Sequence, residues 1–129
     1  MKMLIVDDSL IIRRKIEREI QLPELTEILM ANNGREAVDV FRDHRPELVT
    51  MDLTMPEMNG TECVKQLVAI KADTVILVVS ALADKATAIK AIKNGAYGFL
   101  CKPFTEAQLN DALTKCIAYT REIKRSHAD

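Results

Sequence analysis

Short apolar runs alternate with longer amphipathic stretches along the whole chain. The apolar runs are Met3–Val6, Thr26–Ala31, Leu48–Met51, Thr74–Ser80 and Tyr97–Cys101. Runs of this length that are apolar throughout, rather than at every second position, are typical of strands buried on both faces. The stretches between them place apolar residues three or four positions apart, which is typical of helices with one buried face. The pattern therefore predicts five strand–helix units.

Polar residues mark the expected helix starts. Asn33 and Asn59 each have a glutamate three residues later, and Thr105 has Gln108 at the same spacing. This spacing is typical of capping boxes, in which a side chain accepts a hydrogen bond from the first turn. Asp84 is the expected N-cap residue of the fourth helix.

The repeat of apolar residues predicts which helix faces are buried. Ile12, Ile16 and Ile20 should face the core in the first helix, which Pro23 ends, and Ile89 and Ile92 should do so in the fourth, which Asn94-Gly95 ends. In the last helix the inward residues should be Leu109, Leu113, Cys116 and Ile117. The polar residues from Arg121 to Asp129 are expected to fray.

Alternating strands and helices predict an α/β fold with a parallel sheet, right-handed crossovers and helices on both faces. A length of 129 residues suits one domain with a single core. We therefore expect a domain over residues 1–121 followed by a polar tail at 122–129. The order of the strands cannot be read from this pattern.

Composition excludes several classes of partner. The chain is 48% hydrophobic and 29% charged with a formal net charge of -1, so it has no general attraction for nucleic acids or anionic membranes. No segment approaches the length of an apolar membrane span. The three cysteines are widely spaced and odd in number, which favours reduced thiols. We expect a cytoplasmic protein without direct nucleic-acid binding or membrane insertion.

Polar residues that could form a site follow four of the predicted strands. Asp7 and Asp8 follow the first strand, Asp52 the third, Ser80 ends the fourth and Lys102 follows the fifth. In a parallel sheet these strand ends meet at one edge, where ligands bind in open α/β folds. Any one of these residues alone could be a solvated turn or cap residue. Their convergence predicts a functional site.

The chemistry of this set points to phosphoryl transfer. Three crowded carboxylates need raised pKa values or a bound cation, and a compact set of oxygen ligands suits Mg²⁺. A carboxylate such as Asp52 can act as a nucleophile toward phosphorus, while Ser80 donates a hydrogen bond and Lys102 supplies a positive charge. The set predicts an aspartyl phosphate.

These motifs resemble those of the receiver domains of two-component response regulators, including the single-domain chemotaxis regulators, over nearly the whole chain. The resemblance implies a flavodoxin-like strand order, 2-1-3-4-5. It also implies a cis peptide bond before Pro103 that aims the preceding lysine. The motifs are Leu4–Ser9, Met51–Pro56 with Asn59-Gly60, Ser80-Ala81 and Lys102–Phe104.

The resemblance assigns roles to the acidic residues. It implies that Asp52 is the phosphoacceptor and that a histidine kinase is the phosphodonor. Asp7 and Asp8 would bind Mg²⁺ together with Asp52 and the backbone carbonyl of Thr54. On this reading the protein is a binding module controlled by phosphorylation, rather than an enzyme with an external product.

The resemblance also implies a switch. On phosphorylation Ser80 would move toward the phosphoryl group and Phe99 would swing inward behind it. This motion would repack the surface of the fourth helix, fifth strand and fifth helix, where a downstream protein would dock. Tyr97, Lys90 and Lys93 are candidates for that surface.

Other functions remain open on the sequence. A phosphatase of the haloacid dehalogenase kind also forms an aspartyl phosphate, but it carries a second aspartate where this chain has Thr54. A flavin carrier would need a phosphate-binding loop after the first strand, where Asp7-Asp8 would repel the ligand. Within the receiver class, the chain could act alone on a partner such as a flagellar motor, or relay phosphate. We expect a natural terminus at the polar tail, with a fragment of a longer regulator as the alternative.

Two positions that vary among receivers are expected to tune the lifetime of the phosphoryl group, namely Thr54 and Leu82. Because Leu82 offers no hydrogen bond to an attacking water, we expect Leu82→Glu to lose phosphate faster than the parent chain. The measurement is the decay of the phosphorylated protein after the phosphodonor is removed. Unchanged or slower loss would contradict this expectation.

Overall fold

The computed structural model describes residues 1–55, 58–81 and 85–127. The strands are β1 (Lys2–Val6), β2 (Glu27–Ala31), β3 (Leu48–Asp52), β4 (Val75–Ala81) and β5 (Gly98–Lys102). The helices are α1 (Leu10–Glu19), α2 (Gly34–His44), α3 (Gly60–Ile70), α4 (Lys85–Lys93) and α5 (Glu106–His127). All five predicted strand–helix units are therefore present.

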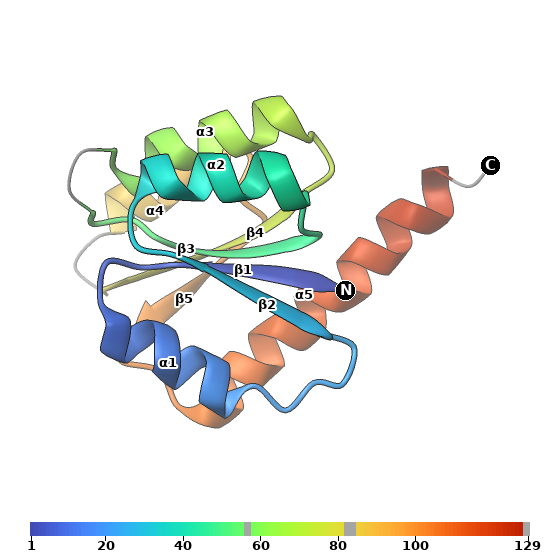
Figure 1. The fold of residues 1–129 in the computed structure, drawn as a ribbon, viewed down its shortest axis with the longest axis horizontal. Coiled ribbons are helices and arrows are strands. Elements are labelled where there is room, and N and C mark those ends of the chain that lie inside the picture. The colour runs from blue at the N-terminus through green and yellow to red at the C-terminus, as the bar shows by residue number, and fades with distance from the viewer. Residues whose placement is uncertain (56–57, 82–84, 128–129) are drawn as a thin grey trace.

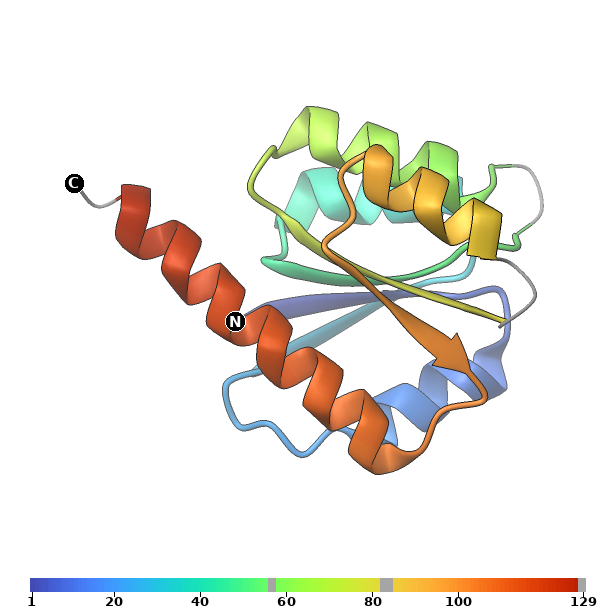
Figure 2. The same ribbon diagram turned by 180° about the vertical axis from the view of Figure 1, so that it is seen from behind.

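The strands form one parallel sheet in the order β2-β1-β3-β4-β5. Helices α2, α3 and α4 cover one face of the sheet, and α1 and α5 cover the other (Figures 1 and 2). This confirms the parallel sheet predicted from the alternation and the strand order implied by the resemblance. It also leaves β2 and β5 as the two edge strands.

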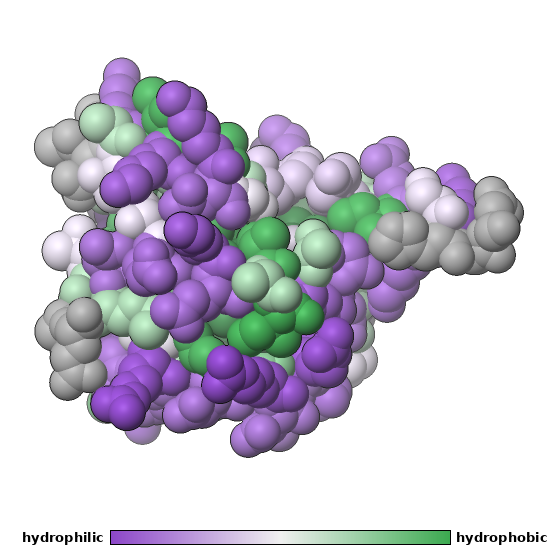
Figure 3. Space-filling model, turned by 90° about the horizontal axis from the view of Figure 1, so that it is seen from above, coloured by the Kyte–Doolittle hydropathy of each residue, from purple (hydrophilic) through white to green (hydrophobic). Residues whose placement is uncertain are grey.

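The core has two layers, one on each face of the sheet. Val49 and Met51 point toward α2, α3 and α4, whereas Leu48 points toward α1 and α5. All five residues of β3 are buried, as its uniformly apolar pattern predicts for a central strand. The outer surface seen from the side of α2 and α3 is mainly hydrophilic, with hydrophobic residues gathered near its middle (Figure 3).

The predicted caps are present where the structure describes them. The side chains of Asn33 and Asn59 each accept a hydrogen bond from the backbone N–H three residues later. Thr105 and Gln108 bond reciprocally, each backbone N–H donating to the other side chain, which completes a capping box. Asp84, the expected cap of α4, lies outside the described residues.

The buried face of α4 differs from the prediction. Ile89 and Ile92 are 55% and 45% exposed, while Ala88 and Ala91 are buried in their place. Alanine lets the helix lie close to α3 and β4, and this turns the isoleucines toward solvent. The predicted helix end is correct, because Gly95 takes a left-handed φ of 119°.

The end of α5 also differs from the prediction. Instead of fraying after Arg121, the helix continues to His127 and projects from the body of the domain (Figure 2). Ile123 packs against the core on this side of the sheet, and the Arg121 guanidinium lies 3.8 Å from the Glu24 carboxylate. These two contacts stabilise the last helical turns, which the polar sequence had predicted to fray.

All three cysteines are free thiols. Cys63 and Cys116 are buried, and burial raises the pKa of each thiol to about 12, so neither is a reactive thiolate at neutral pH. Cys101 is only partly buried, because it lies on an edge strand. Within the described ranges, none of the helices is both long and apolar enough to cross a membrane.

Gly60 is required by a close approach between α3 and the end of β3. A Cβ at this position would lie 2.4 Å from the Asp52 carbonyl oxygen and 2.5 Å from the Leu53 Cα. These are backbone atoms, so the clash cannot be relieved by rotating a side chain. The glycine therefore lets the helix begin directly beside the strand end that carries Asp52.

We predict that Gly60→Ala lowers the free energy of unfolding by about 1–3 kcal/mol, because it overpacks a rigid contact. Gly98→Ala is the matched control, since its Cβ would meet only Leu77 Cδ1 at 3.7 Å, an ordinary contact. Urea unfolding of both variants measures the difference. Equal stability of the two variants would contradict the predicted close approach.

Candidate functional site

The predicted acidic residues meet at the carboxyl edge of the sheet. Val6 and Met51 are register partners on the neighbouring strands β1 and β3, so Asp7 and Asp52 emerge side by side. Carboxylate oxygens of Asp7, Asp8 and Asp52 lie within 4.8 Å of one another. Asp7 and Asp52 are buried and Asp8 is exposed, so the cluster is open to solvent on one side.

Lys102 reaches the same cluster from β5. Its Nζ lies 3.1 Å from Asp7 Oδ2 and 3.5 Å from Asp52 Oδ1. Burial alone would lower the pKa of this ammonium group, but the two carboxylates outweigh it and the pKa is raised. The Lys102–Pro103 peptide bond is cis, as the resemblance implied. Lys102 is therefore a fixed cation between two buried acids.

Asp52 is the most perturbed acid of the set. Burial, followed by the nearby negative charge of Asp7, raises its pKa to about 6. Lys102 and the backbone N–H of Thr54, which donates to Asp52 Oδ1 at 3.2 Å, act in the opposite direction. The carboxylate is thus mostly ionised at neutral pH, but it is held in an environment that disfavours its charge.

Backbone and side-chain donors hold Asp7 in place. The Ser9 backbone N–H donates to Asp7 Oδ1 at 2.9 Å, and the Ser9 hydroxyl oxygen caps α1 by accepting from Ile12 N. Arg13 Nη1 donates to the Asp7 backbone carbonyl at 2.6 Å. Sequence reasoning missed Arg13, since it stands beside Arg14 in a helix and no sequence pattern distinguishes the two.

The other residues predicted for the site or its switch are Ser80, Phe99, Thr54 and Leu82. Ser80 is buried on β4, one residue beyond Val79, the register partner of Asp52, so it lies at the predicted edge. Phe99 is partly buried and packs against the core layer beneath α2, α3 and α4. Thr54 is exposed beside Asp52. Leu82 lies outside the described residues, so its expected role stays a prediction.

The donor set fits a magnesium ion. It consists of hard carboxylate oxygens, and three carboxylates with one lysine leave a net negative charge at a compact site. Burial is the main cause of the raised pKa of Asp52, and the negative charge of Asp7 adds to it. Asp7, Asp8 and Asp52 are the residues that would hold the ion, and exposed Asp8 lies where an ion would enter.

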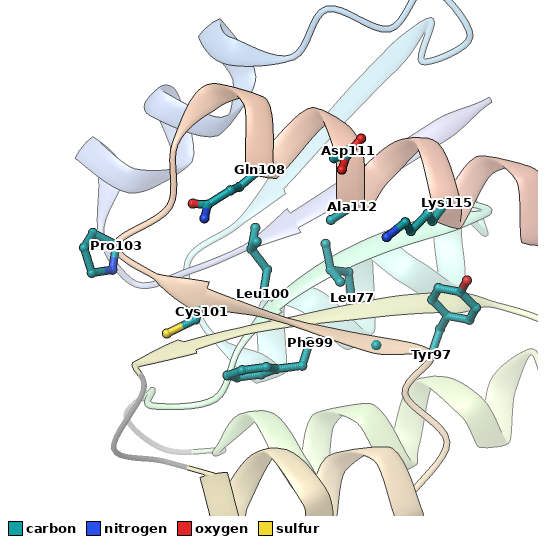
Figure 4. A pocket seen from close by; sticks show the side chains of 11 residues that line it. Leu77, Tyr97, Phe99, Leu100, Cys101, Pro103, Gln108, Asp111, Ala112 and Lys115 are labelled. Atoms are coloured by element: carbon teal, nitrogen blue, oxygen red, sulfur yellow. The ribbon is translucent and has the colours of Figure 1, made fainter.

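A cleft separate from this site lies between β5 and α5 (Figure 4). It has a volume of about 460 Å³ and none of the three acids lines it. Leu77 and Leu100 form its floor, while Gln108, Asp111 and Lys115 of α5 line one side (Figure 4). The position of the cleft on an edge strand suits a docking surface for another molecule, separate from the acidic site.

The buried charge of Asp52 predicts a pH-dependent effect on stability. Its pKa rises from 3.8 to about 6 on folding, so its ionisation destabilises the folded state progressively as pH rises through this window. In metal-free buffer, Asp52→Asn should raise the free energy of unfolding at pH 7 by about 1–3 kcal/mol, and this gain should vanish near pH 4.

Urea unfolding at several pH values with a chelator measures the gain. Asp39→Asn is the matched control, because it makes the same chemical change at an exposed position on α2. A gain at Asp52 that stays constant from pH 4 to 7 would contradict the assignment of its pKa.

Comparison with known proteins identifies the family. Residues 3–114 match the model of the response regulator receiver domain. The chain is 40% identical to the chemotaxis protein CheY of Thermotoga maritima over 114 residues, covering 88% of this chain and 95% of that protein. It is 36% identical to CheY of Bacillus subtilis, covering 90% and 97% of the two chains. The structure of Vibrio cholerae CheY4 superposes with a TM-score of 0.81 at 31% identity, covering 89% and 97%. The chain therefore belongs to the response regulator receiver family.

Proposed function

We propose that Asp52 accepts a phosphoryl group from the phosphohistidine of a histidine kinase, with Mg²⁺, and that this modification changes the affinity of a separate surface for a partner protein. The observation that carries the proposal is the buried Asp52 carboxylate, flanked by Asp7, Asp8 and Lys102 at the edge of the sheet. Lys102 supplies positive charge for the phosphoryl oxygens, and Asp7 and Asp8 would hold the Mg²⁺ that supplies more.

The proposed reaction is a displacement at phosphorus. A carboxylate oxygen of Asp52 forms the new bond to phosphorus, the phosphorus–nitrogen bond of the donor breaks, and its electron pair leaves with the imidazole. Lys102, held close to Asp52, offsets negative charge on the phosphoryl oxygens, and Ser80 donates a hydrogen bond to one of them. Bound Mg²⁺ would neutralise further charge on those oxygens.

The proposed output surface is the exposed face of α4, β5 and α5. Ile89 and Ile92 are exposed on α4, and Tyr97 and Tyr119 stack at the end of the cleft with ring centroids 4.6 Å apart. Phe99 lies on β5 between this surface and the core, where a change in its rotamer would alter both. Ser80 is one strand away, on β4, so its movement would be transmitted through Phe99.

The charge of α4, one side of this surface, indicates the kind of partner. Helix α4 carries exposed lysines at positions 85, 90 and 93 and has no acidic residue, whereas the whole chain has a formal net charge of -1. An acidic segment with apolar anchors is therefore the complementary partner. We propose a role in chemotaxis, with control of a flagellar motor as the output, and this is supported by the similarity to chemotaxis proteins. A phosphorelay intermediate is the second candidate within this class.

A phosphatase function is disfavoured by the residue two positions after the nucleophile. Thr54 occupies the place where haloacid dehalogenase enzymes carry an acidic residue, and its exposed side chain is not an acid. We therefore expect only the transfer of a phosphoryl group to Asp52 and its slow hydrolysis.

We predict that a small phosphodonor with Mg²⁺ adds one phosphoryl group to the protein, on Asp52. Asp52→Asn should abolish the addition, because an amide is a far weaker nucleophile than a carboxylate. Intact-protein mass spectrometry, followed by mapping of the modified peptide, measures it.

Two controls make this test specific. Asp39→Asn removes an exposed aspartate of α2 that is not part of the acidic cluster and should leave the labelling intact. A chelator should suppress labelling of the parent chain. Undiminished labelling of Asp52→Asn would refute the assignment of the phosphoacceptor.

A further inference from the structure

Arg13 joins α1 to the acidic edge of the sheet. Its Nη1 donates to the backbone carbonyl oxygen of Asp7 at 2.6 Å, in a partly buried contact between residues six positions apart. A charged donor at this distance makes one of the stronger kinds of hydrogen bond. Arg14, the next residue, is exposed, so two arginines that look equivalent in the sequence differ in their surroundings.

The bond acts on the peptide unit that joins the two acids. The carbonyl of Asp7 and the N–H of Asp8 belong to one planar unit, so fixing the carbonyl also fixes the direction in which Asp8 leaves the strand. The Asp7 carboxylate is already held by Ser9 N and Lys102 Nζ. Asp8 is exposed, and its direction depends on the backbone. Arg13 therefore controls the least constrained of the three carboxylates.

We propose that Arg13 is a positioning residue for the metal site, holding the Asp7–Asp8 peptide so that the Asp8 carboxylate faces Asp52. The proposal rests on the proposed function, since it takes the three acids as the Mg²⁺ ligands. It assigns Arg13 no contact with the ion or with the phosphoryl group.

The sign of the effect separates positioning from simple electrostatics. Arg13 brings a positive charge close to the site of a divalent cation, which on charge alone weakens binding of the ion. If Arg13 acts only through its charge, its removal should therefore strengthen Mg²⁺ binding. When Arg13 positions Asp8, its removal should weaken Mg²⁺ binding in spite of the favourable change in charge.

The test measures Mg²⁺ affinity by isothermal titration calorimetry of the unphosphorylated protein. Arg13→Met should weaken binding about tenfold, the range seen when supports of metal ligands are removed. Arg14→Met removes the same charge from the neighbouring exposed position and should leave the affinity within about twofold, or make it tighter. Mg²⁺ binding by Arg13→Met that equals or exceeds that of the parent chain would overturn the proposal.

A kinetic measurement gives an independent readout. Labelling by a small phosphodonor should need more Mg²⁺ for half-maximal rate in Arg13→Met, while the rate at saturating Mg²⁺ stays within about twofold of the parent chain. A lower maximal rate with an unchanged Mg²⁺ requirement would show that Arg13 acts on the phosphodonor, and would overturn the proposal.

Folding of the variants is checked by thermal unfolding with a chelator. If Arg13→Met does not fold, Arg13→Lys replaces it, because lysine keeps the charge but lacks the planar fork. This variant should also bind Mg²⁺ more weakly than the parent chain, and equal affinity would overturn the proposal. Absence of Mg²⁺ binding by the parent chain would instead refute the proposed function, so the two failures are distinguishable.

Discussion

The ionic contact of Lys102 with Asp7 and Asp52 is the interaction on which the site depends. Two buried carboxylates side by side repel each other, and the Lys102 ammonium group, which lies within 3.5 Å of both, offsets part of this repulsion. Burial is the main cause of the raised pKa of Asp52, and the negative charge of Asp7 adds to it. The site therefore keeps an unfavourable negative charge, which a bound divalent cation would offset.

The fold produces this crowding by joining distant parts of the chain. Asp7 follows β1, whereas Asp52 and Lys102 are the last residues of β3 and β5, and the parallel sheet brings these three strand ends to one edge. Helix α3 starts beside Asp52 only because Gly60 has no side chain. The apolar core on both faces of β3 supplies the stability that keeps an unfavourable charge buried.

Much of this arrangement could be predicted from the sequence. The uniformly apolar runs located the strands, and the caps at Asn33, Asn59 and Thr105 located three helix starts, because these signals are local. The convergence of Asp7, Asp52 and Lys102 followed from parallel strands alone. The order of the strands could not be derived in this way, because it depends on which strands pair. It was inferred from the resemblance to receiver domains.

The errors and omissions involved contacts between distant elements. The tight packing of α4 through Ala88 and Ala91 turned Ile89 and Ile92 outward, although larger apolar residues are ordinarily buried first. Contacts with Glu24 and with the core beneath α1 and α5 stabilise α5 beyond Arg121. Arg13 could not be distinguished from Arg14, because its acceptor is a backbone carbonyl that carries no sequence signal.

The position of the cleft has a thermodynamic consequence. Cys101 and Pro103 line the cleft, and Lys102 between them contacts the acidic site through its ammonium group. The end of β5 therefore contributes to both the cleft and the acidic site. A partner that prefers one position of β5 must then alter the affinity of the acidic site for its ligands. By linkage, those ligands alter the affinity for the partner by the same factor. A molecule bound in the cleft would thereby make the acidic site hold its metal ion more tightly or more loosely.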